Sequence, residues 1–322
     1  MRILQAFPQD GFSYERHGEI ATLAPQAWQA WTHWPADAPI GGPPEAVEDR
    51  VLLAALDRIE RDLSILVDLE TIASEVGLSP FHFHRRFAES MGETIGAYVR
   101  RTRLEHAATI ICRTPTPILD AALRTGYNSQ PAFTRAFARR FHATPSRLRA
   151  AVAASMPTAS RLHHDLVQGT AEVRRDKTPL IAMRFHGGLH LIPGHWRRFA
   201  RMVTAAGLSL DGAQPVGILY DDPALTAPER MRYDCALVDP GSTFPPLRAP
   251  LRRMRMRSGT YASLDVAGPH HLIAEAIFGV CVLWMPRAKR VFGDAPAYEV
   301  YGAPPWAAGG HFSARVLVPT DG

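Results

Sequence analysis

The sequence predicts a multidomain protein in which an all-α domain is followed by an α+β domain with an antiparallel sheet. Two internal repeats support this prediction. Phe83–Phe87 (FHRRF) returns fifty positions later as Phe133–Phe137 (FTRAF), within stretches that have helical spacing. After residue 170 the pattern changes to short strands with turns, and Phe185–Ile192 matches Val266–Ile273 at an offset of 81. A chain of 322 residues is long enough for two such domains.

Composition says little about partners. The net charge is +5 and the pI is about 9.4, and nearly all of the positive charge is arginine, since the only lysines are Lys177 and Lys289. Arginine makes bidentate contacts with phosphate and guanine, but an arginine-rich chain also arises from the base composition of a genome. Cys112, Cys235 and Cys281 are far apart and show no CxxC spacing, which favours a reducing compartment and argues against a cysteine-ligated zinc.

No export, membrane or metal-binding signal is found. The first residues lack the apolar core of a signal peptide, and the longest apolar run, Leu272–Met285, is too short to span a bilayer. His186 and His190 have the spacing of helical metal ligands, but Gly187–Gly188 between them argues against a helix. We therefore expect a soluble, cytoplasmic protein without metal or cofactor.

The expected domain boundaries follow the changes in composition. Residues 1–45 are rich in proline and form a poorly defined N-terminal extension, and residues 46–150 form the helical domain, which opens with an amphipathic helix from Glu45 to about Asp62. Residues 151–169 are alanine-rich and then polar, which indicates a linker, and residues 170–322 form the α+β domain.

The helical domain is predicted to hold two helix-turn-helix units. In the first, a short helix over residues 69–77 ends at a glycine, and Ser79 caps the next helix. Phe83 and Phe87 lie one helical turn apart and are expected to face the core. Three residues of this helix share the opposite face, and three of the second unit take their places: Phe81, His84 and Arg85, replaced by Pro131, Thr134 and Arg135.

A longer helix is predicted to connect the two units, from Thr94 to Arg113. At about 1.5 Å per residue it is on the order of 30 Å long. Adjacent major-groove faces of B-DNA are roughly 34 Å apart, so the length of this helix favours two readers on neighbouring turns of one duplex.

The α+β domain contains one charged position that its own repeat lacks. Pro215–Tyr220 aligns with Pro296–Tyr301, which places Glu299 where the first half has Ile218. A carboxylate on an inward strand face is costly unless a cation meets it. One interpretation is a ligand cation held by Glu299 within an aromatic wall, whose candidates are Tyr220, Tyr261, Trp284 and Tyr301. A salt bridge to an arginine, or exposure of that strand face, is the alternative.

The two helix-turn-helix units, together with Ile95–Arg100 and Ala122–Gln130, resemble the DNA-binding domain of the AraC/XylS family. The resemblance implies that two recognition helices contact bases and that two arginines contact phosphate; these residues are Phe81, His84, Arg85, Gln130, Thr134 and Arg135 for bases, and Arg100 and Arg101 for phosphate. Leu148 replaces a usual aromatic, and Pro131 and Ala132 stand where relatives often carry polar side chains, which favours readout through DNA shape at the second unit.

Tyr220–Pro223, Ala267–Pro269 and Tyr298–Tyr301 resemble motifs of the gyrase-inhibitor-like (GyrI-like) effector-binding domain. This resemblance implies a duplicated α+β pocket for hydrophobic, often cationic compounds, and it places the glutamate of the last motif at Glu299. The DNA reader comes first here, whereas in many AraC-type regulators it is C-terminal.

Together these features predict a one-component transcription regulator, not an enzyme. Its expected partners are double-stranded DNA, at two adjacent major-groove segments, and a small-molecule effector that changes either DNA affinity or contact with RNA polymerase. Two alternatives for the C-terminal domain remain open. In one it is a hydrolase with Glu299 as general base; in the other it is a protein-docking or sequestering module.

Overall fold

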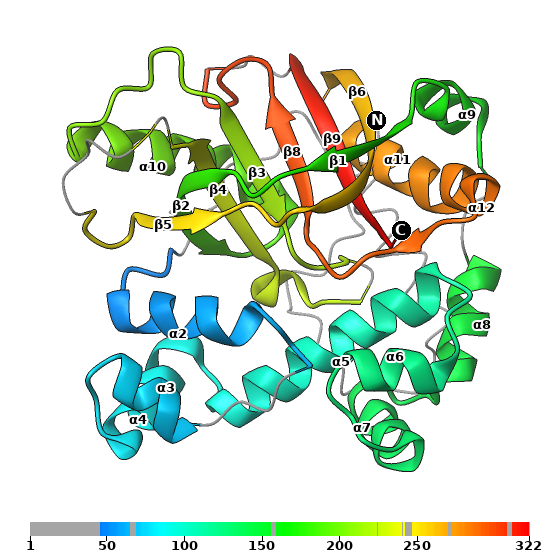
Figure 1. The fold of residues 1–322 in the computed structure, drawn as a ribbon, viewed down its shortest axis with the longest axis horizontal. Helices are drawn as coiled ribbons and strands as arrows, with labels where there is room; N and C mark the ends of the chain where they lie inside the picture. Colours follow the sequence, from blue (N-terminus) through cyan, green and yellow to red (C-terminus); the bar gives the residue numbers. More distant parts are fainter. Residues whose placement is uncertain are drawn as a thin grey trace, which may run out of the picture.

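The computed structural model describes residues 46–64, 69–155, 159–223, 225–239, 241, 247–269, 272–307 and 311–321. The expected N-terminal extension, residues 1–45, lies outside the described residues. A group of helices packs against a sheet that has further helices beside it (Figure 1). The predicted fold class is confirmed, because α-helices build the first part of the described chain and an antiparallel sheet with helices follows. None of the helices described is long and apolar enough to cross a membrane.

The helices of the first part are α2 (Arg50–Glu60), α3 (Leu69–Glu75), α4 (Pro80–Met91), α5 (Ile95–Arg113), α6 (Ile118–Arg124), α7 (Gln130–Phe141) and α8 (Pro145–Ser155). Helix α2 is shorter than the sequence predicts because Asp49 caps it, its carboxylate accepting a hydrogen bond from the N–H of Val51 at 2.9 Å.

Helices α4 and α7 begin and end alike, in line with the fifty-residue repeat. Ser79 and Ser129 each accept a hydrogen bond from the backbone N–H three residues further on, at 3.3 and 3.4 Å. Gly92 ends α4 in the left-handed region at φ 66°, and His142 does the same for α7 at φ 53°.

Paired phenylalanines form the centres of two small cores, one towards each end of α5. Phe83 and Phe87 are fully buried, and Phe87 meets Tyr98 of α5 edge to face at 5.5 Å between ring centroids. Phe133 and Phe137 are also fully buried, and their ring centroids lie 5.3 Å apart. Because α5 packs against both cores, it fixes the two helix-turn-helix units relative to each other.

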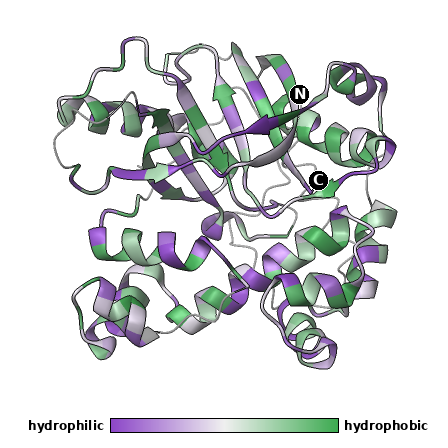
Figure 2. Cartoon of the chain, in the orientation of Figure 1, coloured by the Kyte–Doolittle hydropathy of each residue, from purple (hydrophilic) through white to green (hydrophobic). Residues whose placement is uncertain are grey.

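The second part is one nine-stranded antiparallel sheet in the order β1-β6-β9-β8-β3-β4-β2-β5, with β7 pairing with β9. Its strands are β1 (Ala171–Arg175), β2 (Pro179–His186), β3 (Pro215–Leu219), β4 (Arg232–Val238), β5 (Arg252–Arg255), β6 (Gly259–Pro269), β7 (Val291–Phe292), β8 (Ala297–Tyr301) and β9 (His311–Asp321). Hydrophobic residues dominate the central strands, whereas the outer strands β1 and β5 carry hydrophilic segments (Figure 2).

The sheet is duplicated about its middle. Strands β2, β3 and β4 with α10 (Ile192–Ala205) form one half, and β6, β8 and β9 with α11 (Leu272–Gly279) form the other. Helix α11 continues through a π-helical turn, Val280–Trp284, into α12 (Met285–Ala288). The halves meet where β3 pairs with β8. One face of the sheet packs on α10 and α11, and the opposite face has a core of its own.

The stretch expected as a linker, residues 151–169, is largely helical where it is described. Helix α8 continues to Ser155, and α9 spans Arg161–Val167. His163 and Val167 are buried, and His163 contacts the Glu275 carboxylate of α11. Helix α9 therefore packs on the sheet domain, whereas Val152 of α8 belongs to a core of the helical domain. The alanine-rich composition did not indicate this packing.

Candidate functional site

The outer faces of α4 and α7 are exposed. On α4, Phe81 is 72% exposed, the Arg85 side chain is 65% exposed and His84 is half-buried. The Arg85 guanidinium lies 3.7 Å from the Glu89 carboxylate, but both groups are solvated, so this contact holds Arg85 only weakly. An exposed aromatic ring and an exposed guanidinium on the same helix face are well suited to contact base edges.

Helix α7 presents a matching face. Gln130 and Arg135 are exposed and Thr134 is half-buried. The ends of α4 and α7 lie on the side of the molecule turned away from the sheet, towards the two ends of α5 (Figure 1). The structure therefore leaves all six predicted base-contacting residues at least partly accessible on one side of the molecule.

The two predicted phosphate contacts differ. Arg100 is exposed. Arg101 is buried between two carboxylates, with 2.7 Å to Glu93 and 2.8 Å to Glu105, and burial is more than offset by these carboxylates, so that the pKa of Arg101 lies above its usual value. The prediction is wrong for Arg101, because its guanidinium fixes the start of α5 and does not reach the surface.

Glu299 lies inside the sheet domain, on the face covered by α10. It is 1% exposed. Tyr233 of β4 and Tyr301 of β8 donate hydrogen bonds to the same carboxylate oxygen at 2.7 and 2.6 Å. The indole N–H of Trp196 donates in turn to the Tyr233 hydroxyl at 3.2 Å. Burial and the neighbouring Glu299 raise the pKa of both tyrosines well above the usual value, so both stay protonated and act as donors.

A glycine makes room for this cluster. Gly217 of β3 pairs directly with Glu299 across the centre of the sheet. A Cβ atom at position 217 would overlap the Tyr233 hydroxyl and the Glu299 carboxylate. The register also corrects the sequence alignment. Ile218 pairs with Tyr298 and belongs to the core of the opposite face, so the position that the alignment matched to Glu299 does not share the face of Glu299.

The predicted aromatic wall is divided between the two faces of the sheet. Tyr301 contacts Glu299, and Trp284 packs at the edge of the same core. Tyr220 and Tyr261 lie with the core of the opposite face, where Tyr220 donates to Asp234 at 2.7 Å and Tyr261 donates to the Arg257 carbonyl at 2.8 Å. The prediction that four aromatic side chains surround Glu299 is therefore wrong for Tyr220 and Tyr261.

Sequence reasoning missed three members of the Glu299 cluster, namely Trp196, Tyr233 and Gly217. Tyr233 and Gly217 lie beside Glu299 through cross-strand pairing, and the sequence alone does not reveal the register of that pairing. Trp196 lies on the inner face of α10, so amphipathic spacing marks it as core but not as a partner of Tyr233.

The domains meet at a buried cluster of charges around Glu60, the last residue of α2. Arg184 of β2 binds its carboxylate in bidentate fashion at 3.0 and 3.1 Å, and Arg232 of β4 adds an ion pair at 3.0 Å. Burial alone would raise the pKa of Glu60, but the two guanidiniums outweigh it and hold that pKa well below its usual range. Arg184 also binds Asp234, at 2.6 Å, and stacks on Tyr220.

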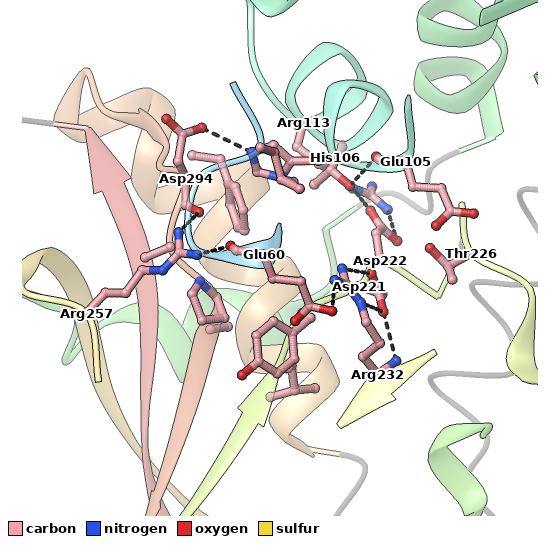
Figure 3. Close-up of a pocket in the computed structure, with 18 of the residues that line it drawn as sticks. Glu60, Glu105, His106, Arg113, Asp221, Asp222, Thr226, Arg232, Arg257 and Asp294 are labelled. Carbon is pink, nitrogen blue, oxygen red and sulfur yellow. Dashed lines mark hydrogen bonds and ion pairs between the residues drawn. The ribbon is translucent and has the colours of Figure 1, made fainter. Parts of the chain in front are cut away.

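Next to this cluster, a cavity of about 520 Å³ opens between the domains (Figure 3). Helix α5 lines one side with His106, Thr109 and Arg113, and the sheet domain lines the other with loop residues and with α11. Tyr220 is the only predicted effector residue in this lining. Glu299 lines neither this cavity nor two others of about 350 and 530 Å³ in the described chain. Trp196 packs against Tyr233 and Tyr301 and is itself buried, so a ligand reaches Glu299 only if side chains packed around this cluster move.

No group of three or more metal-ligating side chains with the geometry to hold an ion is found among the described residues.

Comparison with known proteins agrees with both resemblances. A helix-turn-helix domain model matches residues 72–151, and the GyrI-like small molecule binding domain matches residues 172–309. Transcriptional regulator Rob of Salmonella typhimurium is 40% identical over 88 residues, which are 27% of this chain and 30% of Rob. The chain thus spans less than a third of the length of that relative.

A shorter relative is matched over most of its length. Probable transcription factor PqrA of Proteus vulgaris is 38% identical over 105 residues, which are 33% of this chain and 84% of PqrA. A crystal structure of a transcriptional regulator with an AraC-type DNA-binding domain, from Chromobacterium violaceum, is 27% identical and covers 32% of this chain and 92% of its own, with a TM-score of 0.31. With its tandem helix-turn-helix units and a GyrI-like domain behind them, the chain belongs to the AraC family of transcriptional regulators.

Proposed function

We propose that this protein regulates transcription by reading two adjacent major-groove segments of double-stranded DNA, and that a hydrophobic cation bound at Glu299 controls it. The observation that carries the DNA-reading half of the proposal is the paired exposure of Arg85 and Arg135 at equivalent positions of α4 and α7. Both helices lie on one side of the molecule, with no part of the sheet in front of them (Figure 1).

The DNA contacts follow from the exposed faces. Arg85 and Arg135 have the reach for bidentate contacts with guanine, Phe81 offers an apolar face to a thymine methyl group, and Gln130 suits adenine. His84 and Thr134 stand beside them, and Arg100 supplies a phosphate contact. Arg101 has no part in this set.

The effector contact follows from the Glu299 cluster. A buried carboxylate surrounded by Tyr233, Tyr301 and Trp196 combines a negative charge with aromatic faces, and this is the combination that attracts an organic cation. The cation takes the position that Trp196 now covers. The response reaches transcription through altered DNA affinity or through contact with RNA polymerase, and the protein binds its effector without turnover. A regulator of this kind acts in the cytoplasm, where bacterial DNA lies.

The test is a comparison of specific and non-specific binding in Arg85→Ala and Arg135→Ala. Each bidentate contact with guanine contributes about 1–3 kcal/mol of discrimination, which is roughly a 5- to 150-fold preference. We expect each variant to lose that preference at its own half-site, while binding to random duplex changes much less, as measured by titration of labelled duplexes at fixed salt.

Arg287→Ala serves as the matched control, since Arg287 is an exposed arginine of α12 in the sheet domain. Equal losses on specific and random duplexes in both α4 and α7 variants would refute the base contacts. Effector turnover is checked separately, because a time course in which a bound cation is consumed would replace the sensor with an enzyme.

A further inference from the structure

We propose that the cavity between the two domains is a second ligand site, and that it takes a hydrophobic organic carboxylate. This site is separate from the Glu299 cluster, because none of Glu299, Tyr233, Tyr301 and Trp196 lines the cavity. Its volume of about 520 Å³ falls within the roughly 300–1,000 Å³ that small-molecule pockets usually have.

Five carboxylates of the lining already have basic partners. Asp222 pairs with Arg113 at 2.9 Å, and Asp221 pairs with Arg232 at 2.5 Å. Asp294 forms an ion pair with Arg124 of α6 at 2.7 Å. Glu60 and Glu105 each form ion pairs with arginines as well. A cationic ligand would have to displace one of these pairs, and breaking a buried pair is strongly unfavourable. The lining therefore disfavours a cation.

Arg257 is different. Its guanidinium donates to two backbone carbonyls, those of Asp294 at 3.1 Å and Glu60 at 2.5 Å, and among the described residues no carboxylate lies within ion-pair distance of it. Figure 3 shows the head of Arg257 between Asp294 and Glu60 at the cavity. Guanidinium has five N–H donors in a planar fork, so the two carbonyls leave donors available for a ligand.

The exposed charges at the mouth of the cavity do not change this balance. Arg61 and Asp62 both line it and both are exposed, and the Asp62 carboxylate accepts hydrogen bonds from Ser64. The positive charge of Arg61 and the negative charge of Asp62 offset each other at the surface. The half-buried Arg257 remains the group whose charge the described lining does not neutralise.

The apolar residues of the cavity lining favour a ligand whose remaining part is hydrophobic. The lining includes apolar residues of α11 and its π-helical extension and of two strands: Ile277, Phe278, Cys281, Phe292 and Ala297. An aromatic or aliphatic carboxylate places its carboxylate on Arg257 and its body against these residues. A small hydrophilic anion such as phosphate leaves these apolar residues uncovered and gains little.

Because both domains line the cavity, an occupant contacts the helical domain and the sheet domain together. Binding only to the docked arrangement stabilises that arrangement by mass action. The site thus gives the protein a second chemical input, opposite in charge to the cation at Glu299, at the place where the DNA-reading half meets the effector domain.

The experiment is isothermal titration calorimetry of the full chain with 2-naphthoate and with its neutral analogue 2-naphthalenemethanol. We expect the carboxylate to bind at least tenfold more tightly than the alcohol. Arg257→Gln should remove that difference and leave the affinity for the alcohol unchanged, whereas Arg255→Gln, on an exposed arginine of β5 outside the lining, should change neither.

A second variant guards against misfolding of Arg257→Gln, which circular dichroism would reveal. Ile277→Trp fills the apolar part of the cavity and should weaken both ligands at least tenfold. Unchanged naphthoate affinity in Arg257→Gln or in Ile277→Trp, or the absence of naphthoate binding to the natural chain, overturns the proposal. Loss of naphthoate binding in Glu299→Gln also overturns it, because the anion would then occupy the other site. If no cation binds at Glu299, the naphthoate measurements still test the second site, because the two sites have different linings.

Discussion

At the scale of single residues, Glu299 is the group with the most direct consequence for ligand choice. Its carboxylate is almost fully buried and accepts hydrogen bonds from two tyrosines of neighbouring strands. Neutral donors satisfy its hydrogen-bonding needs but do not neutralise a charge. A bound cation would do both.

Glu299→Gln is therefore expected to weaken binding of a lipophilic cation such as tetraphenylphosphonium at least tenfold, which corresponds to about 1.4 kcal/mol. A neutral hydrophobic analogue should bind as before, because the amide keeps the volume of the side chain and one acceptor. Fluorescence titration of both compounds checks this. Asp265→Asn, on an exposed aspartate of β6, is the control, and unaltered cation affinity in Glu299→Gln would remove Glu299 from the site.

The sequence located Glu299 and Tyr301 because residues two apart on a strand share a face. It could not identify Tyr233 as a partner, because Tyr233 comes from another strand. The repeat alignment matched Glu299 to Ile218, whose side chain faces the opposite side of the sheet; an error of one residue in a strand alignment has this effect. Arg101 was misassigned because the spacing places Glu105 one helical turn away but does not show that both side chains are buried.

At the scale of secondary-structure elements, the pairing of β3 with β8 joins the two halves of the duplicated sheet. The close fit of Gly217 beside Tyr233 and Glu299 makes this pairing sensitive to a single methyl group. The sequence predicted the strands and the duplication, and it predicted the capped start of α4 from Ser79, because these signals are local.

Gly217→Ala is expected to destabilise the sheet domain by about 1–3 kcal/mol, the usual range for overpacking a filled core. It should also disturb the hydrogen bonds to Glu299, so cation binding should weaken together with stability. Urea unfolding measures the first effect. Gly169→Ala is a fair comparison, since a Cβ atom there meets nothing within 4 Å; equal stability of the two variants would contradict the close fit.

At the scale of the whole molecule, buried ion pairs connect the two domains through Glu60, Arg184, Arg232 and Asp234. Nothing in the sequence indicated this docking, because the arginines contribute only an overall positive charge until their partners are known. Which arginine meets which carboxylate depends on residues more than a hundred positions apart. No local pattern encodes such a pairing.

These ion pairs predict acid sensitivity. Burial alone would raise the pKa of Asp234, but Arg184 and Arg252 lower it to about 2, below its ordinary 3.8. On acidification the unfolded chain takes up the proton first, so the contribution of Asp234 is complete above about pH 4 and is lost as the pH falls towards 2. Urea midpoints measured from pH 2 to pH 6 should show this fall.

Asp234→Asn should be less stable than the natural chain at neutral pH and should show a smaller fall between pH 4 and pH 2. Asp211→Asn, on an exposed aspartate away from the domain contact, should follow the natural chain. An unchanged pH profile in Asp234→Asn would show that other carboxyl groups set the acid limit.

Helix α5 has a consequence for which DNA sites this protein can use. It is one continuous helix of 19 residues, buried between two cores and pinned at its start by Arg101. Such a rod sets a fixed helical phase between the two recognition helices. Five extra base pairs between the half-sites would turn the second onto the far side of the duplex, where no flexibility of the protein reaches it, since one turn of B-DNA takes about 10.5 base pairs. The operator, and not the protein, must therefore supply the correct spacing, by its length or by its capacity to twist and bend.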